Sequence, residues 1–74
     1  MLIKVKLFAT FREGRQKEVN FDYFEGITGR FIINKLNIKE KDVAIFLVNG
    51  LDGKLDDPLS DGDVISLFPP VGGG

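Results

Sequence analysis

The final seven residues hold the most distinctive chemistry of this sequence. They run Phe68-Pro69-Pro70-Val71-Gly72-Gly73-Gly74. Each proline fixes its own φ near about −65° and favours an extended residue before it, whereas glycines add length without side-chain bulk. The six residues from Pro69 onward would span roughly 20 Å when fully extended. Such a tail would be narrow enough to enter a channel in another protein and to present the carboxylate of Gly74 there. The alternative is an ordinary frayed terminus, the usual state of the last residues of a domain, and the rest of the chain must decide between the two.

Composition limits the chemistry available elsewhere in the chain. The 74 residues carry a net charge of −1 and include no cysteine and no histidine. A thiol nucleophile, the usual zinc ligands and the commonest acid–base side chain near neutral pH are therefore missing. The remaining carboxylates, lysines, serines and Tyr23 show no catalytic grouping. We expect a chain that is not catalytic alone and that binds no metal and no cofactor.

The same composition bears on partners and location. Lysines and arginines are scattered rather than arranged in a stripe, and the pI is about 5.2, so we expect no nucleic-acid partner. No apolar run approaches the length that spans a membrane, so we expect no membrane association. The absence of cysteine fits a reducing compartment, and we expect a cytoplasmic protein.

Alternating apolar residues predict two strands at the start of the chain. In residues 2–9, Ile3, Val5 and Leu7 share one face, and Phe8 lies on the other face with two lysines. Residues 18–22 alternate again after a short polar loop. Because the connection is short, we expect the two strands to be antiparallel.

A helix is predicted over residues 29–37, with Thr28 as its N-cap. Ile32 and Leu36 stand four residues apart and would face the core. Gly29 and Arg30 are unfavourable in the first turn, because glycine is a poor helix former and a cation opposes the helix dipole there. Packing against a sheet must therefore hold this helix.

Three further strands are predicted after the helix. Residues 43–48 form an unbroken apolar run that ends at the turn pair Asn49-Gly50. This run reads as a strand buried on both faces, or with one face covered by a partner. A short strand is expected around Leu55. Residues 64–68 form the last strand, with Ile65 and Leu67 on one face.

This order of elements predicts an α+β fold, with a mixed sheet of four to five strands and one main helix on one face. The first and last strands should lie at its centre. We expect a domain over residues 1–68 and a flexible tail over residues 69–74. The uncovered face would carry Phe8, Val64 and Phe68 near the start of the tail. These side chains are either a contact patch for a partner or ordinary core.

The end of the chain resembles the C-terminal signature of the ubiquitin-like sulfur carriers, a family that includes the small subunit of molybdopterin synthase and the carrier of the thiamine pathway. The resemblance is strongest over residues 61–74, which read DGDVISLFPPVGGG. Residues 5–13 and 48–50 are also similar to the family. Gly72 and the helix region 27–36 depart from the family pattern. The resemblance implies the β-grasp fold of ubiquitin, in agreement with the predicted order of elements.

The resemblance also implies a mechanism and partners. A ubiquitin-activating-like adenylyltransferase would use ATP to adenylate the Gly74 carboxylate, and persulfide sulfur would convert it to a thiocarboxylate. The tail would then enter the large subunit of molybdopterin synthase. Gly73 and Gly74 would form the reactive end. The partner-binding residues would be Phe8, Arg12, Val64, Phe68, Pro69, Pro70, Val71 and Gly72.

Other functions remain open at this point. The chain would serve as a thiamine-type sulfur carrier, as a ubiquitin-like protein modifier, or as an interaction module with an inert tail. The Pro69-Pro70 pair favours the molybdopterin carrier over the thiamine carrier within the family. Arg12 is either a docking residue or a solvated loop charge.

Overall fold

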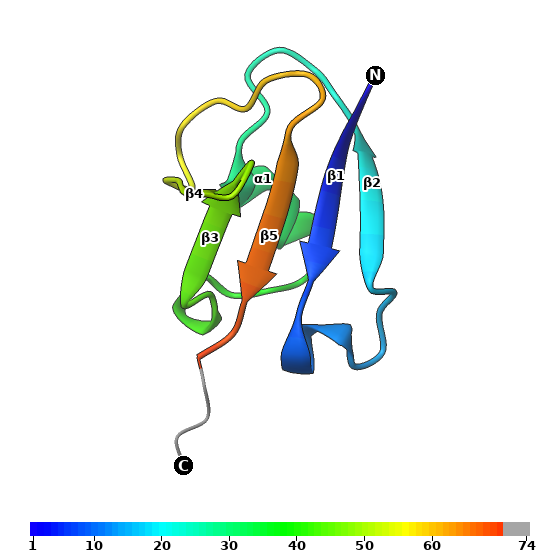
Figure 1. Cartoon of the computed structure of the whole chain (residues 1–74), viewed down its shortest axis with the longest axis vertical. Coiled ribbons are helices and arrows are strands. Elements are labelled where there is room, and N and C mark those ends of the chain that lie inside the picture. The colour runs from blue at the N-terminus through cyan, green and yellow to red at the C-terminus, as the bar shows by residue number, and fades with distance from the viewer. Residues whose placement is uncertain (71–74) are drawn as a thin grey trace.

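A five-stranded mixed sheet forms the body of the protein, as the computed structural model shows for residues 1–70, the part of the chain that it describes (Figure 1). The elements are β1 (Leu2–Leu7), β2 (Glu18–Asp22), α1 (Gly29–Lys35), β3 (Ile45–Val48), β4 (Leu51–Asp52) and β5 (Val64–Phe68). The strand order is β2-β1-β5-β3-β4. β1 and β5 are parallel neighbours, which confirms that the first and last strands lie near the centre.

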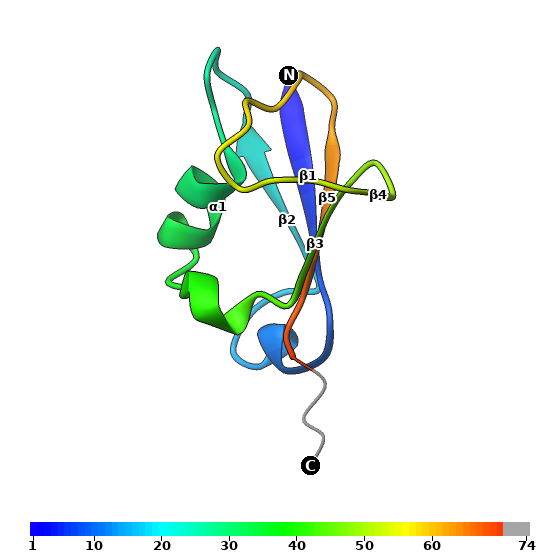
Figure 2. The ribbon, with the colours of Figure 1, turned by 90° about the vertical axis from the view of Figure 1, so that its left-hand side faces the viewer.

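The helix α1 covers one face of the sheet, and Figure 2 shows the layers from the side. Period-two alternation turns every second side chain of the central strands toward this helix. The central-strand residues beneath the helix are fully buried: Ile3, Val5, Leu7, Ile65 and Leu67. The predicted faces of both strands are therefore confirmed, and so is the predicted fold class.

The connection between β1 and β2 holds a turn that the sequence pattern did not predict. β1 ends at Leu7, and residues Ala9–Arg12 form a 3₁₀ helix, η1, with Phe11 buried. Ala9 has a φ of 53°, a left-handed conformation that is uncommon for a residue other than glycine. The predicted strand therefore ends two residues early. The antiparallel pairing of β1 and β2 is as expected.

The helix α1 begins where the sequence predicts and ends two residues earlier. Thr28 is the N-cap, and its Oγ1 accepts a hydrogen bond of 3.2 Å from the backbone N–H of Phe31. Ile32 is fully buried, and Leu36 is partly buried just beyond the last helical residue. Asn37 has a φ of 60°, a left-handed conformation that commonly follows the end of a helix.

One prediction about the later strands is wrong, and one alternative of another is excluded. β3 is not buried on both faces, because Ile45 is 45% exposed while Phe46 beside it is 7% exposed; the alternative, one face covered by a partner, stays a prediction. The short strand is β4 at Leu51–Asp52 and does not lie around Leu55. The left-handed pair Asn49-Gly50 turns the chain directly back, so that Leu51 pairs with Val48. Leu55 instead packs against the core from a loop.

Candidate functional site

The chain leaves the sheet beside a pair of stacked aromatic rings. β1 and β5 are parallel, so both strands end at the same edge of the sheet. Phe8 follows β1 and Phe68 ends β5; their rings lie 4.3 Å apart between centroids, at an interplanar angle of 6°. Both side chains are half-buried on the face that α1 does not cover. The structure therefore brings together two of the predicted partner-binding residues where the tail begins.

Ile45 extends this apolar surface. It lies directly opposite Phe68 in the antiparallel β3–β5 pair, where side chains on one face are in contact. We call Phe8, Ile45 and Phe68 the root patch. Sequence reasoning missed Ile45, because the unbroken apolar run 43–48 has no alternation to show which side chains face outward. The register of β3 against Phe68 is the information that places it.

Backbone hydrogen bonds pair β5 with its neighbours as far as its last residue, Phe68. The N–H of Phe8 donates to the carbonyl of Leu67 at 3.2 Å, and the N–H of Ala44 donates to the carbonyl of Phe68 at 2.9 Å. Pro69 and Pro70 follow, half-buried and exposed respectively. Because proline has no N–H, neither residue can donate to the sheet. The sheet pairing of the described chain therefore ends at Phe68, directly before Pro69.

Arg12 is fixed by contacts within the chain. Its Nε donates a hydrogen bond of 2.7 Å to the carbonyl of Leu7, and its guanidinium carbon lies 5.2 Å from the centroid of the Phe8 ring. This distance is within the range of a cation–π contact, which extends to about 6 Å. Arg12 therefore belongs with the root patch in space.

The remaining predicted site residues either lie far from the root patch or fall outside the part of the chain that the structure describes. Val64 is on the same open face but at the opposite end of β5, opposite Lys4. Val64 and Phe68 are the first and last residues of β5, four steps along the strand or about 13 Å apart. Val71, Gly72, Gly73 and Gly74 lie outside the described residues.

The charged groups with shifted pKa values lie away from the root patch, on the helical side. The guanidinium of Arg30 binds both carboxylate oxygens of Asp56, at 2.6 and 3.1 Å, and Glu40 at 2.8 Å. The hydrogen bond from Arg30 lowers the pKa of Asp56. Hydrogen bonds to Asp56 and then Glu40 raise the pKa of Arg30. This cluster ties α1 to two loops and explains how a cation is tolerated in the first helical turn.

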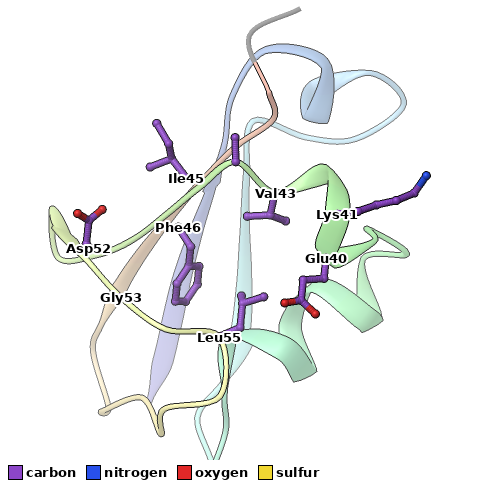
Figure 3. A pocket seen from close by; sticks show the side chains of 9 residues that line it. Glu40, Lys41, Val43, Ile45, Phe46, Asp52, Gly53 and Leu55 are labelled. Carbon is purple, nitrogen blue, oxygen red and sulfur yellow. The ribbon is translucent and has the colours of Figure 1, made fainter.

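A hollow of about 610 Å³ lies beside β3 and β4 (Figure 3). Val43, Phe46 and Leu55 are among its apolar lining residues, as is Ile45 of the root patch, and Glu40 and Asp52 are among its charged residues. None of the predicted site residues lines it. Within residues 1–70, no cluster of three or more acidic side chains is arranged to hold a metal ion, and no described helix is long and apolar enough to cross a membrane.

The fold and the site together define a class. A mixed sheet with parallel central strands, one covering helix and a last strand that leads into a Pro-Pro/Gly-Gly tail is the ubiquitin-like sulfur-carrier fold. Residues 5–74 match the ThiS family, and the chain belongs to this family. A comparison with curated protein sequences found no significant match.

Solved structures agree with this class. A structure assigned to molybdopterin converting factor, subunit 1, of Pyrococcus furiosus is 34% identical, with a TM-score of 0.74 over 96% of this chain and 99% of that chain. SAMP1 of Haloferax volcanii is 26% identical, with a TM-score of 0.78 over 100% of both chains. A complex of subunits 1 and 2 of the molybdopterin-converting factor of Helicobacter pylori matches at 28% identity, with a TM-score of 0.67 over 100% of both chains. The prediction of a small partner subunit agrees with the Pyrococcus furiosus and Helicobacter pylori structures, each of which is described as subunit 1 of a converting factor.

Proposed function

We propose that this protein is a sulfur carrier for molybdopterin biosynthesis in the cytoplasm, with the sulfur held on the carboxyl group of Gly74. The observation that carries the proposal is that the match to the ThiS family extends through the tail to residue 74. The 34% identity to the Pyrococcus furiosus protein supports molybdopterin as the product. The absence of cysteine leaves the terminal carboxyl group as the place for sulfur.

The chemistry proceeds in three balanced steps. The Gly74 carboxylate attacks the α-phosphorus of ATP in a ubiquitin-activating-like enzyme, which releases pyrophosphate and forms an acyl adenylate. A persulfide sulfur displaces AMP from this acyl group. A thiol then attacks the donor's sulfur in this acyl disulfide, so that the S–S bond breaks, a new disulfide joins the donor to the thiol, and the Gly74 thiocarboxylate is released. The carrier itself binds no cofactor and supplies no catalytic base; ATP belongs to its partner. Glycines at positions 73 and 74 would let the backbone enter a narrow active site.

The thiocarboxylate is then delivered to the large subunit of the synthase. The Helicobacter pylori relative is in a complex with its subunit 2, which supports a two-subunit assembly here. We assign the root patch to this contact, because exposed apolar side chains beside the start of the tail would be covered when the tail enters a partner. The two prolines restrict the conformations of the tail and so lower the ordering cost of binding.

Intact-mass measurement tests the proposal. The full chain is incubated with the activating enzyme of its host, ATP and a sulfur donor. Exchange of one oxygen for sulfur should raise the mass by about 16 Da, and omission of ATP should abolish the gain. An unchanged mass with an activating enzyme that is competent on its own substrate would reject the sulfur-carrier function.

Two deletions show that the end of the chain is responsible. Deleting both Gly73 and Gly74 leaves a single terminal glycine after Val71 and should abolish the mass gain while leaving the fold intact, because the Gly-Gly end is the part that is activated. Deleting Gly74 alone is the matched control: the chain still ends in two glycines, so sulfur loading should persist at a reduced rate. Loss of folding on deletion of Gly73 and Gly74 would contradict the proposed role of the tail.

Two other fates of an activated Gly74 need separate tests. The likeness to SAMP1, a small archaeal modifier protein, favours conjugation to lysines as a second candidate function. Denaturing gels of host extract, probed for this chain, would show such conjugates as higher-mass bands. A thiamine-type carrier would load sulfur but fail to yield molybdopterin when the large subunit and the pterin precursor are added.

A further inference from the structure

Phe68 is the last described residue whose carbonyl is bonded into the sheet, by the N–H of Ala44. The direction in which the tail leaves the fold therefore depends on how firmly Phe68 is placed. The side chain of Phe68 is half-buried and lies on the face without a helix. Its ring is held by contacts that this face itself provides, above all the ring of Phe8 at 4.3 Å.

A second contact holds Phe8 in turn. The guanidinium of Arg12 lies 5.2 Å from the centroid of the Phe8 ring, and its Nε donates to the carbonyl of Leu7 at 2.7 Å. Leu7 immediately precedes Phe8, so Arg12 contacts both the backbone beside Phe8 and the Phe8 ring. Phe8 is thus the shared partner of Arg12 and Phe68.

The backbone of Ala9 makes this return of the chain possible. With a φ of 53°, Ala9 turns the chain into η1 immediately after Phe8, and η1 ends at Arg12. A left-handed alanine is strained, and such strain persists only where the surrounding structure imposes it. The hydrogen bond and the ring contact of Arg12 are interactions that compensate for this conformation.

We infer that Arg12 is a positioning residue for the tail, acting through Phe8 on Phe68, in addition to any contact that it makes with a partner. This inference rests on the proposed function, because a preset tail direction has value only if the tail must enter a partner. Holding Phe68 before binding lowers the ordering cost of association. Removing Arg12 should therefore weaken binding to the large subunit.

A double-mutant cycle tests whether Arg12 acts through Phe8. Binding of the full chain to the large subunit is measured for the wild type, Arg12→Ala, Phe8→Leu and the double variant. Arg12→Ala should weaken binding roughly fivefold in the wild type, the equivalent of one cation–π contact, and should have little further effect beside Phe8→Leu. Independent, multiplicative effects would overturn the inference.

The conservative variant Arg12→Lys separates the hydrogen bond of Arg12 from its charge. Lysine keeps a positive charge that can lie over the Phe8 ring but lacks the Nε donor that reaches the carbonyl of Leu7. The inference predicts that Arg12→Lys weakens binding, and by less than Arg12→Ala, because only the hydrogen bond to Leu7 is lost. A lysine variant that binds like the wild type would show that this hydrogen bond plays no part in placing Phe8 and would overturn that part of the inference.

Ring resonances of the free chain provide a readout that needs no partner. Arg12→Ala should shift the NMR signals of the Phe68 ring, because it removes the guanidinium that holds the stacked ring of Phe8. Arg15→Ala is the matched control, because it removes the same charge from the same loop but contacts the carbonyl of Leu36 at 3.0 Å rather than Phe8; it should leave the Phe68 signals in place. Unchanged Phe68 signals in Arg12→Ala would contradict the inference.

The two proposals fail in different ways. A wild-type chain that takes up no sulfur contradicts the proposed function, while the ring resonances still test the positioning by Arg12. A chain that loads sulfur normally but shows independent effects in the binding cycle contradicts only the positioning role.

Discussion

Gly29 shows how one residue can be unfavourable locally and required by its neighbours. Glycine lowers helix propensity by about 1 kcal/mol relative to alanine, yet it occupies the first position of α1. A Cβ at this position would lie 2.5 Å from Cζ and 2.8 Å from Cε1 of Phe46. Phe46 is only 7% exposed, so its ring has little room to move away. The close approach of helix and sheet therefore selects glycine.

Replacing Gly29 by alanine should destabilise the protein. Overpacking costs about 1–3 kcal/mol, which exceeds the gain in helix propensity of about 1 kcal/mol, so we expect a net loss of about 1 kcal/mol in urea unfolding. Asn34→Ala, at an exposed position of the same helix, is the control and should be neutral or stabilising. A stabilised Gly29→Ala variant would show that the Phe46 ring moves at little cost to accommodate the added methyl group.

At the scale of elements, α1 is held to the rest of the fold by an ion cluster as well as by its buried face. Arg30 in the first turn binds Asp56 from the loop before β5 and Glu40 from the short 3₁₀ helix η2 (Glu40–Asp42). The backbone N–H of Arg30 also donates to the carbonyl of Leu55 at 3.0 Å. The cluster therefore joins three segments that are distant in sequence.

This cluster should make stability depend on pH. Arg30 holds the pKa of Asp56 below its ordinary value of 3.8. The stabilisation from ionised Asp56 is therefore fully present above about pH 4, the pKa in the unfolded chain, and is lost as the pH falls through the lowered folded-state pKa. The effect should be small and should weaken in high salt, because the groups are exposed.

The variant Asp56→Asn isolates this contribution. It should lower the urea midpoint relative to the wild type at about pH 6, and the difference should shrink as the pH falls through the lowered pKa of Asp56 and the wild-type carboxyl also becomes neutral. Asp57→Asn removes a neighbouring exposed carboxylate that has no ion pair among the described residues, and it serves as the control. A difference between wild type and Asp56→Asn that is constant with pH would contradict this account.

At the scale of the whole molecule, the buried core and the proposed reactive end occupy different parts of the chain. The buried apolar side chains of the described structure all lie between Ile3 and Leu67, and the central strands β1 and β5 contribute five of the fully buried ones. This separation supports our proposal of a domain over residues 1–68 with a tail after it. In such an arrangement the tail can be altered without altering the fold.

Removal of residues 71–74 should therefore leave the free energy of unfolding within about 0.5 kcal/mol of the wild type, as for other changes away from the core. Urea denaturation of the truncated chain checks this, and the sulfur-loading assay on the same sample should show no activity. A larger loss of stability would place the end of the domain beyond Phe68.

The local pattern of the sequence was sufficient to predict much of the fold. Alternation in β1 and β5 placed Ile3, Val5 and Leu7 against the helix, and an oxygen-bearing side chain before the helix identified Thr28 as its cap. These features depend on neighbours within a few residues, so they are encoded locally. The tail composition raised the carboxyl end as a candidate reactive part, and the resemblance to the sulfur carriers, rather than the composition itself, led to its place in the proposed function.

Only the tertiary structure decided which distant residues meet. The turn at Asn49-Gly50 placed β4 at Leu51, strand order brought Phe8 to Phe68, and register set Ile45 opposite Phe68. The left-handed Ala9 returned Arg12 to Phe8. The physical reason is that periodicity determines the face on which a side chain lies, whereas its contacts across the sheet depend on strand order and register, which the whole chain sets together.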